Sequence, residues 1–259
     1  MKYCDFLKLL ACSPTLPVSF SLYKEKLVME KGSISYILDA LKMIRVIYIY
    51  LFSIMIFGGI SYFPLLTNNI TLLKHSFWLK IVFLAILVII DGKVSEIILN
   101  KKNESLFNVF KRYFIRVCGL GLFFALIIML IIFGIYVLNN ATGNKLSGFH
   151  SLYYFRNLII NVLLIYTVPL IYFDVPIYTA ISLGLKSLVG NMKFTSPLIV
   201  LSLIEGTMYS VPYIPINIGS KYLNFFAWEI GIIIDLIVFI AASMILKEKV
   251  FAIENGEIV

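Results

Sequence analysis

Six long apolar stretches separated by short polar segments dominate the chain. Each has about the 20 residues that an α-helix needs to cross a bilayer core about 30 Å thick. The stretch LGLFFALIIMLIIFGIYVL (Leu120–Leu138) is apolar on every face, whereas a strand of a membrane barrel alternates apolar and polar residues. The pattern therefore predicts an all-α integral membrane protein. Its six transmembrane helices are expected at about residues 46–66, 77–97, 117–138, 158–180, 197–216 and 225–246.

The regions outside these helices predict a single transmembrane domain over residues 29–246 between two cytoplasmic tails. The first apolar stretch of the N-terminal tail (residues 1–28) ends at Cys12. The residues up to this cysteine are similar to a lipoprotein cleavage site. Asp5 and Lys8 interrupt that stretch, which favours an interfacial or loosely ordered tail over a signal sequence. Translation from Met29 is an open alternative. Residues 247–259 form the C-terminal tail.

Composition supports the membrane assignment. Hydrophobic residue types make up 61% of the 259 residues and charged types 14%, and the mean hydropathy is +0.96. A soluble domain has about 45–50% apolar and about 25% charged residues, so this chain has too few charges to cover a water-facing surface. A soluble globular enzyme is excluded, and so is a disordered chain, which would be poor in apolar residues.

The positions of Lys and Arg predict the orientation. Of the 22 basic residues, 17 fall before the first span, between spans two and three, between spans four and five, or after span six. The positive-inside rule therefore predicts a multi-pass protein of the cell (cytoplasmic) membrane with both termini in the cytoplasm. The expected partners are the lipid bilayer and the anionic lipid head groups of its cytoplasmic face, and another membrane subunit is a further candidate. Nucleic acid is not expected, because the basic residues follow the topology.

Similar polar segments recur at the cytoplasmic ends of the predicted helices. One precedes span one, one precedes the amphipathic segment FNVFKRYF (Phe107–Phe114) and span three, and one begins at Lys247. The recurrence is consistent with three helical hairpins in parallel orientation, each with an amphipathic cytoplasmic helix. Chance similarity of short segments is the alternative.

The stretch Pro169–Ser187 combines Pro, an acid, Ala and a Lys-Ser ending where span four leaves the membrane. In this it resembles a broad group of six-helix prokaryotic membrane-domain proteins, including the membrane domain fused to some glycerophosphodiester phosphodiesterases. The resemblance covers about 20 residues and implies a membrane module of unknown role. It carries over no functional residue.

Five acidic residues lie within or at the edge of the apolar stretches: Asp91, Asp174, Glu205, Glu229 and Asp235. An ionised carboxylate near the bilayer centre costs about 2.5–3.5 kcal/mol, so each is a candidate for function. For Asp91 and Asp174 we favour a polar position at the interface or a cap for a helix break. For Glu229 we favour a position near the outer interface, where it can reach the interface or pair with Lys221. Glu205 and Asp235 fall near the middle of consecutive spans, with no Lys, Arg or His at that depth.

We therefore expect Glu205 and Asp235, with Asp174 as a further member, to form an intramembrane proton or cation site, since adjacent carboxylates without a cation cannot all ionise. The alternative is structural: neutral acids that hydrogen-bond to Ser202, Thr207, Tyr209 or the backbone and hold the helices together.

No enzyme motif is present. The chain has no HExxH, GxSxG or GxxxxGK[ST], and its cysteines, Cys4, Cys12 and Cys118, have no metal-ligand spacing. We expect no enzymatic activity, no catalytic residue, no cofactor and no metal centre. The sequence favours a transporter or permease-like module. The alternative is a non-catalytic scaffold or accessory subunit that binds lipid or another membrane protein.

Overall fold

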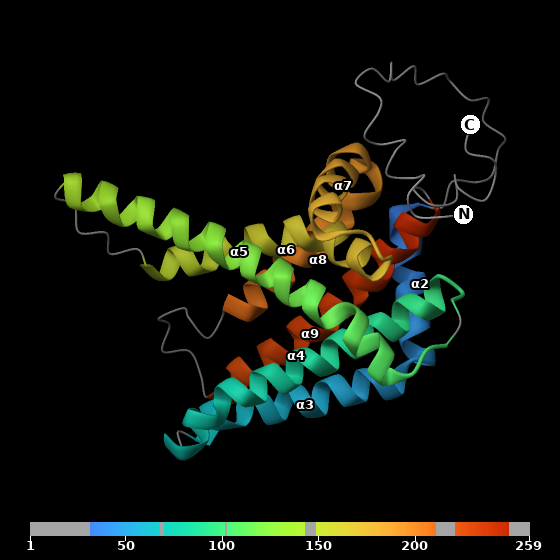
Figure 1. The fold of residues 1–259 in the computed structure, drawn as a ribbon, viewed down its shortest axis with the longest axis horizontal. Helices are drawn as coiled ribbons and strands as arrows, with labels where there is room; N and C mark the ends of the chain where they lie inside the picture. The colour runs from blue at the N-terminus through green and yellow to red at the C-terminus, as the bar shows by residue number, and fades with distance from the viewer. Residues whose placement is uncertain (1–31, 68–69, 102, 143–148, 211–220, 249–259) are drawn as a thin grey trace. The chain divides into compact units, whose positions relative to one another are not determined.

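Helices make up all the regular secondary structure of the part of the chain that the structure describes. The structure is a computed structural model, and it describes residues 32–67, 70–101, 103–142, 149–210 and 221–248. Figure 1 labels the helices. They are α2 (Ser33–Val46), α3 (Tyr48–Thr67), α4 (Ile70–Ile98), α5 (Leu106–Thr142), α6 (Phe149–Tyr172), α7 (Ile177–Gly190), α8 (Met192–Ser210) and α9 (Lys221–Leu246). The expectation of an all-α chain is confirmed for these residues.

Helix α9 lies at the centre of the packing. It contacts α2, α3, α4, α6 and α8, while α6 also packs against α7 and α8. Ile240, Ala241 and Ile245 of α9 are fully buried. Helix α5 contacts α4, α6 and α7. Among its described side chains the buried ones, Val109, Tyr113 and Leu120, lie in its first half.

Helix α5 is one continuous helix of 37 residues. It includes Phe107–Phe114, for which the sequence predicted a separate amphipathic segment before span three. The helix does not break there because no Pro or Gly interrupts residues 106–116, and Val109 and Tyr113 pack on one side against Gly92 of α4.

Helices α4 and α6 end in the same way. In α6 the N–H of Val175 donates to the carbonyl of Leu170, and the N–H of Asp174 donates to the carbonyl of Ile171. Asp174 has a φ of 68°, so the end is a Schellman motif with an aspartate in the left-handed position. Asn100, with a φ of 52°, occupies that position at the end of α4.

This motif changes the fourth predicted span. The sequence predicted one helix over residues 158–180, but α6 ends at Tyr172 and α7 begins after Pro176. Proline has no N–H to continue a helix, and the left-handed Asp174 turns the chain back. α7 then packs closely on α6: a Cβ on Gly184 would lie 2.4 Å from Oγ1 of Thr167 and 3.0 Å from its backbone nitrogen.

Two further joints are sharply bent. α2 meets α3 at 83° across Ile47, and α7 meets α8 at 107° across Asn191. Tyr36 and Ala40 bury one face of α2, whereas Ile34, Leu38 and Leu41 remain exposed. Helices α2 and α7 are therefore short segments set at a steep angle to the helices that follow them.

Among the described residues, two helices are long and apolar enough to cross a membrane, Leu106–Ile131 within α5 and Leu223–Leu246 within α9. The number is four if each bent pair crosses as one span, which compares with the six spans that the sequence predicted. One reason for the difference is that α4 carries Lys80, Asp91, Lys93 and Glu96 along its described side chains. Residues 1–31 and 249–259, which hold the N-terminal tail and most of the C-terminal tail, and residues 211–216 of the fifth predicted span lie outside the described residues.

Candidate functional site

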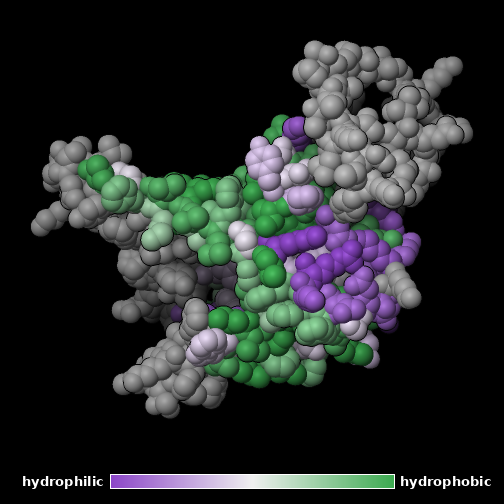
Figure 2. Space-filling view, in the orientation of Figure 1, coloured by the Kyte–Doolittle hydropathy of each residue, from purple (hydrophilic) through white to green (hydrophobic). Residues whose placement is uncertain are grey.

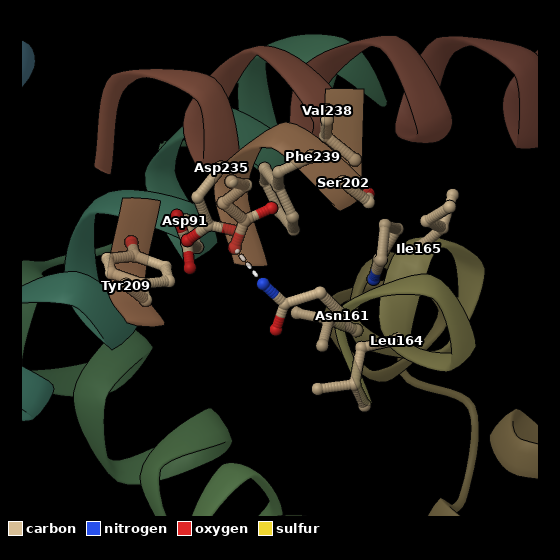
Figure 3. A pocket seen from close by; sticks show the side chains of 12 residues that line it. Asp91, Asn161, Leu164, Ile165, Ser202, Tyr209, Asp235, Val238 and Phe239 are labelled. Carbon is tan, nitrogen blue, oxygen red and sulfur yellow. Dashed lines mark hydrogen bonds between the residues drawn. The ribbon is translucent and has the colours of Figure 1, made fainter. Parts of the chain in front are cut away.

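A cavity of about 270 Å³ lies between helices α4, α6, α8 and α9 (Figure 3). Its wall combines acidic, polar, aromatic and aliphatic side chains. They are Asp91, Asn161, Leu164, Ile165, Val168, Pro169, Ser202, Glu205, Tyr209, Asp235, Val238 and Phe239. At about 30 Å³ for each water molecule in the liquid, the cavity has the volume of roughly nine waters.

Glu205 and Asp235 both line this cavity, as the sequence pattern placed them together. Glu205, on α8, is 5% exposed and accepts a hydrogen bond of 2.9 Å at Oε1 from Nδ2 of Asn161 on α6. Asp235, on α9, is exposed to the cavity. No other described residue forms a hydrogen bond or ion pair with the Asp235 carboxylate. The two acids therefore share one space without bonding each other.

Asp91 is the third acid of the cavity, and the sequence analysis missed it. It lies on α4 and makes a side-chain hydrogen bond with Tyr172, at the end of α6. The sequence interpretation placed it at the interface because it lies towards the inner end of its predicted helix, where water and Lys93 can reach it. Lys93 and Glu96 could have given the opposite signal, because a Lys and a Glu three positions apart on a helix can neutralise each other. In the structure both are buried, and Lys93 Nζ lies 2.8 Å from Glu96 Oε2.

A close approach of α8 to α9 sets the position of Tyr209 in the wall. A Cβ on Gly231 would lie 2.8 Å from Cε1 of the Tyr209 ring. Only glycine leaves room for the ring at this point, so Gly231 brings an aromatic face to the same cavity as Glu205 and Asp235.

Among the described residues, the cavity wall has an excess of hydrogen-bond acceptors and no basic side chain. Ser202 is fully buried, and its Oγ has no hydrogen-bond partner among the residues that the structure describes. A buried hydroxyl without a partner among the described residues can still form a hydrogen bond with a bound group. Within the same described ranges, no group of three or more His, Cys, Asp or Glu side chains is close enough to hold a metal ion.

Asp174 does not belong to this cavity, which corrects the expectation that it joins Glu205 and Asp235. It lies in the turn after α6 and forms ion pairs with three basic side chains. Arg112 holds it with two hydrogen bonds, Nε to Oδ1 at 2.8 Å and Nη2 to Oδ2 at 2.7 Å, while Lys101 and Arg116 lie 2.9 and 3.1 Å away. Burial opposes ionisation of this carboxyl, but Lys101 and Arg112 outweigh burial and lower its pKa below the usual value.

Asp174 and its partners belong to a larger polar cluster, which we call the polar cap: Lys93, Glu96, Lys101, Asn103, Glu104, Arg112, Arg116 and Asp174. Lys93 ties the turn after α4 to the helix, because it donates to Asn103 Oδ1 at 2.7 Å and to the backbone carbonyl of Glu104. Figure 2 shows hydrophilic surface over this turn and the start of α5, and apolar surface along the rest of α5.

Glu229 lies outside the cavity, on α9 two turns before Asp235. It is 5% exposed, and neither carboxylate oxygen has a hydrogen-bond partner among the described residues. A Cβ on Gly59 of α3 would lie 3.7 Å from its Oε1, so Glu229 faces α3. The sequence interpretation placed it near the outer interface as a partner for Lys221, whose side chain lies outside the described set.

Comparisons of the chain with protein-family models, with curated proteins and with solved structures found no match.

Proposed function

We propose that this protein is a transporter or permease-like module of the membrane, and that its acid-lined cavity holds a proton or another cation during transfer. The observation that carries the proposal is the meeting of Asp91, Glu205 and Asp235, from three different helices, around one cavity without a basic side chain. Acids inside membrane domains are rare and typically mark ion or substrate pathways.

The cost of this arrangement supports a functional origin. Three carboxyl groups around a space of about 270 Å³ repel one another when ionised, so they must take up protons or attract a cation. A bundle stabilised by packing alone would gain by replacing them with apolar side chains of similar volume. The buried Ser202 hydroxyl, which has no partner among the described residues, adds an unused acceptor to the same wall.

The proposed setting is a six-helix protein of the cell membrane with both termini in the cytoplasm. In this orientation the polar cap lies on the cytoplasmic side, where the sequence concentrates Lys and Arg. Helix α2 belongs to the same end, because Tyr36 donates to Glu248 after α9. We propose that α2 lies along the inner surface, with Ile34 and Leu38 in the apolar layer and Lys42 near anionic head groups.

Flux measurements in proteoliposomes test the proposal. The purified protein is reconstituted, and proton and cation flux are followed with fluorescent indicators under an imposed gradient. The double variant Glu205→Gln/Asp235→Asn should lose the flux, because it removes two charges from the cavity with little change in volume. Glu229→Gln is the matched control and should retain it, since Glu229 lies outside the cavity. Unchanged flux in the double variant would refute the proposal.

The second candidate function is a scaffold or accessory subunit, and the exposed surface of α5 favours it. Leu122, Leu126, Met129 and Leu130 are each more than half exposed. Lipid would cover this surface in a monomer, and a helix of another subunit would cover it in a complex. A scaffold would show no flux in any variant, and native mass spectrometry from membranes would find it in a complex that charged substitutions at Met129 and Leu130 disrupt.

A further inference from the structure

We infer that the cavity binds a small organic cation, an ammonium group on an aliphatic chain, in preference to a metal ion. The juxtaposition that carries the inference is that of Asp91, Glu205 and Asp235 with aliphatic and aromatic side chains on the same wall (Figure 3). The inference rests on the proposed function, because it names the class of cation that the transport site would take.

The placement of the acids argues against a bare metal ion. Ca²⁺ takes six to eight oxygen ligands at about 2.3–2.6 Å, and Mg²⁺ takes six at about 2.0–2.1 Å. In the described part of the chain no three acidic, His or Cys side chains come close enough for such a shell. The three carboxyls instead surround a space of about 270 Å³, which a larger cation can fill.

The apolar half of the wall argues for a cation that carries carbon atoms. Leu164, Ile165, Val168, Pro169 and Val238 line the cavity together with the acids. A hydrated inorganic ion gains nothing from these side chains, whereas each CH₂ group of an alkylammonium ion that they cover improves the affinity by about fourfold. The cavity, at about 270 Å³, is slightly smaller than the 300–1,000 Å³ that is typical for drug-sized ligands, which limits the cation to a small molecule.

The remaining side chains fit the ammonium head. Figure 3 shows Tyr209 and Phe239 on the same side of the cavity as Asp235, and an ammonium ion near an aromatic face gains cation–π attraction. An ammonium group donates up to three hydrogen bonds and accepts none. Ser202 Oγ can accept one of these bonds, because it has no partner among the described residues. Asn161 Oδ1 can accept another, because Asn161 directs its Nδ2 to Glu205.

Calorimetric titration of the full chain in lipid nanodiscs tests the inference directly. The probes are 1,4-diaminobutane and butylamine as hydrochlorides, 1,4-butanediol as the neutral match to the diamine, and NaCl and MgCl₂ at matched ionic strength. We expect at least one of the two ammonium probes to bind more than tenfold more tightly than the diol and either metal ion. Equal binding of the diol, tighter binding of Na⁺ or Mg²⁺, or no binding of either ammonium probe would overturn the inference.

Variants locate the binding in the cavity. Asp235→Asn should weaken ammonium binding by about tenfold or more, because hydrogen bonds to a charged group are among the strongest in proteins. Glu229→Gln should bind as the unmodified protein does, since it changes a buried acid of the same helix outside the cavity. Leu164→Trp fills the space and keeps every acid, so it should block binding even if Asp235→Asn does not fold. Normal binding in a folded Leu164→Trp variant would sink the inference.

The two proposals fail separately. Flux of protons or metal ions that needs Glu205 and Asp235, without ammonium binding, would sustain the transport function and refute the ligand class. Ammonium binding that depends on the cavity but produces no flux would sustain the ligand class and refute transport.

Discussion

In the part of the chain that the structure describes, helices α5 and α9 are the two unbroken helices that can cross a membrane, and they differ in almost every other respect. In the most apolar window of α9, 67% of the residues are buried within the protein, against 6% in the corresponding window of α5. α9 packs against five helices, whereas α5 is anchored near its start and leaves Leu122, Met129 and Leu130 exposed.

The difference in burial explains why α9 carries acidic residues and α5 does not. α9 carries Glu229 and Asp235. Three of the five helices that pack against it, α4, α6 and α8, line the cavity with Asp235, and all five contribute packing. α5 carries no acid between Leu106 and Thr142. A lipid-facing helix has no partner for a carboxylate, so its charges are confined to its polar end. The presence of acids therefore distinguishes the bundle centre from the periphery where hydropathy does not.

The largest expected effect is a difference in packing between the two helices. Ile240 of α9 is fully buried and Ile131 of α5 is 55% exposed. Ile240→Ala should lower the free energy of unfolding by about 2–5 kcal/mol, because it leaves a cavity in the core. Ile131→Ala should lower it by less than about 1 kcal/mol, since lipid or detergent replaces the lost contacts. Unfolding in mixed dodecyl sulfate micelles, followed by tryptophan fluorescence, measures both.

Equal costs for these two substitutions would contradict the comparison. The result would mean that a second copy or another subunit covers α5 under the conditions of the measurement. Repeating the experiment over a tenfold range of protein concentration would then separate self-association from a tightly packed monomer.

Glycine substitutions give the next largest effect, and their signs should be opposite. Gly231→Ala on α9 places a methyl group 2.8 Å from the Tyr209 ring, and overpacking of this kind costs about 1–3 kcal/mol. Gly121→Ala on α5 meets nothing within 4 Å, so the higher helix propensity of alanine should stabilise the protein by about 0.5–1 kcal/mol. The same unfolding assay compares them, and a destabilising Gly121→Ala would show that α5 is covered at that turn.

The sequence predicted where the long helices lie better than it predicted which residues they pack against. Hydropathy placed α5 and α9 because a helix in lipid must be apolar over its length, whatever it packs against. A helix break at Asp174 was one of the two interpretations, but its position was not predicted, because the break depends on a left-handed Asp174 stabilised by Arg112, a residue 62 positions earlier in the chain. Such a tertiary contact leaves no periodic signal.

The candidate site was predicted in part, for a similar reason. Glu205 and Asp235 were placed together because both lie at mid-depth in consecutive predicted spans. Asp91 and Asp174 were placed near the interface because each lies close to the end of a predicted span. A position near the end of an apolar stretch does not show that a residue is at the interface when the helix continues beyond that stretch. α4 runs seven residues past Asp91 because Lys93 and Glu96 neutralise each other inside the protein.

The ion pairs of Asp174 with Arg112 and Arg116 near the start of α5 should depend on pH. The pKa of Asp174 is lowered in the folded protein, so its ion pairs stabilise the fold above the unfolded pKa of about 3.9 and lose this effect as the pH falls through the lowered pKa. Asp174→Asn should therefore cost about 1–2 kcal/mol at pH 6 and much less at pH 3. Melting temperatures of both proteins between pH 6 and pH 3 test this.

A control separates the carboxylate from general acid sensitivity. Asp39→Asn removes an acid from an exposed ion pair outside the polar cap, with Lys42, whose side chain is 78% exposed. It should change stability by less than about 0.5 kcal/mol at every pH, since exposed pairs contribute little. A parallel pH profile for Asp174→Asn and the unmodified protein would show that the polar cap does not depend on the charge of Asp174.

The smallest expected effect concerns a polar group inside the well-packed helix. Ser243 of α9 is fully buried, and its Oγ has no hydrogen-bond partner among the described residues. Ser243→Ala removes an unsatisfied hydroxyl and improves helix propensity, so it should be neutral or stabilising by up to about 1 kcal/mol. Ser53→Ala on α3 removes a hydroxyl that donates to the Ile49 carbonyl at 2.9 Å, which makes it the matched control. A clear loss of stability in Ser243→Ala alone would mean that a bound water or ligand satisfies this hydroxyl. The interior around α9 would then contain bound water as well as packed side chains. The difference between α9 and α5 would then depend on the polar groups of α9 as much as on its packing contacts.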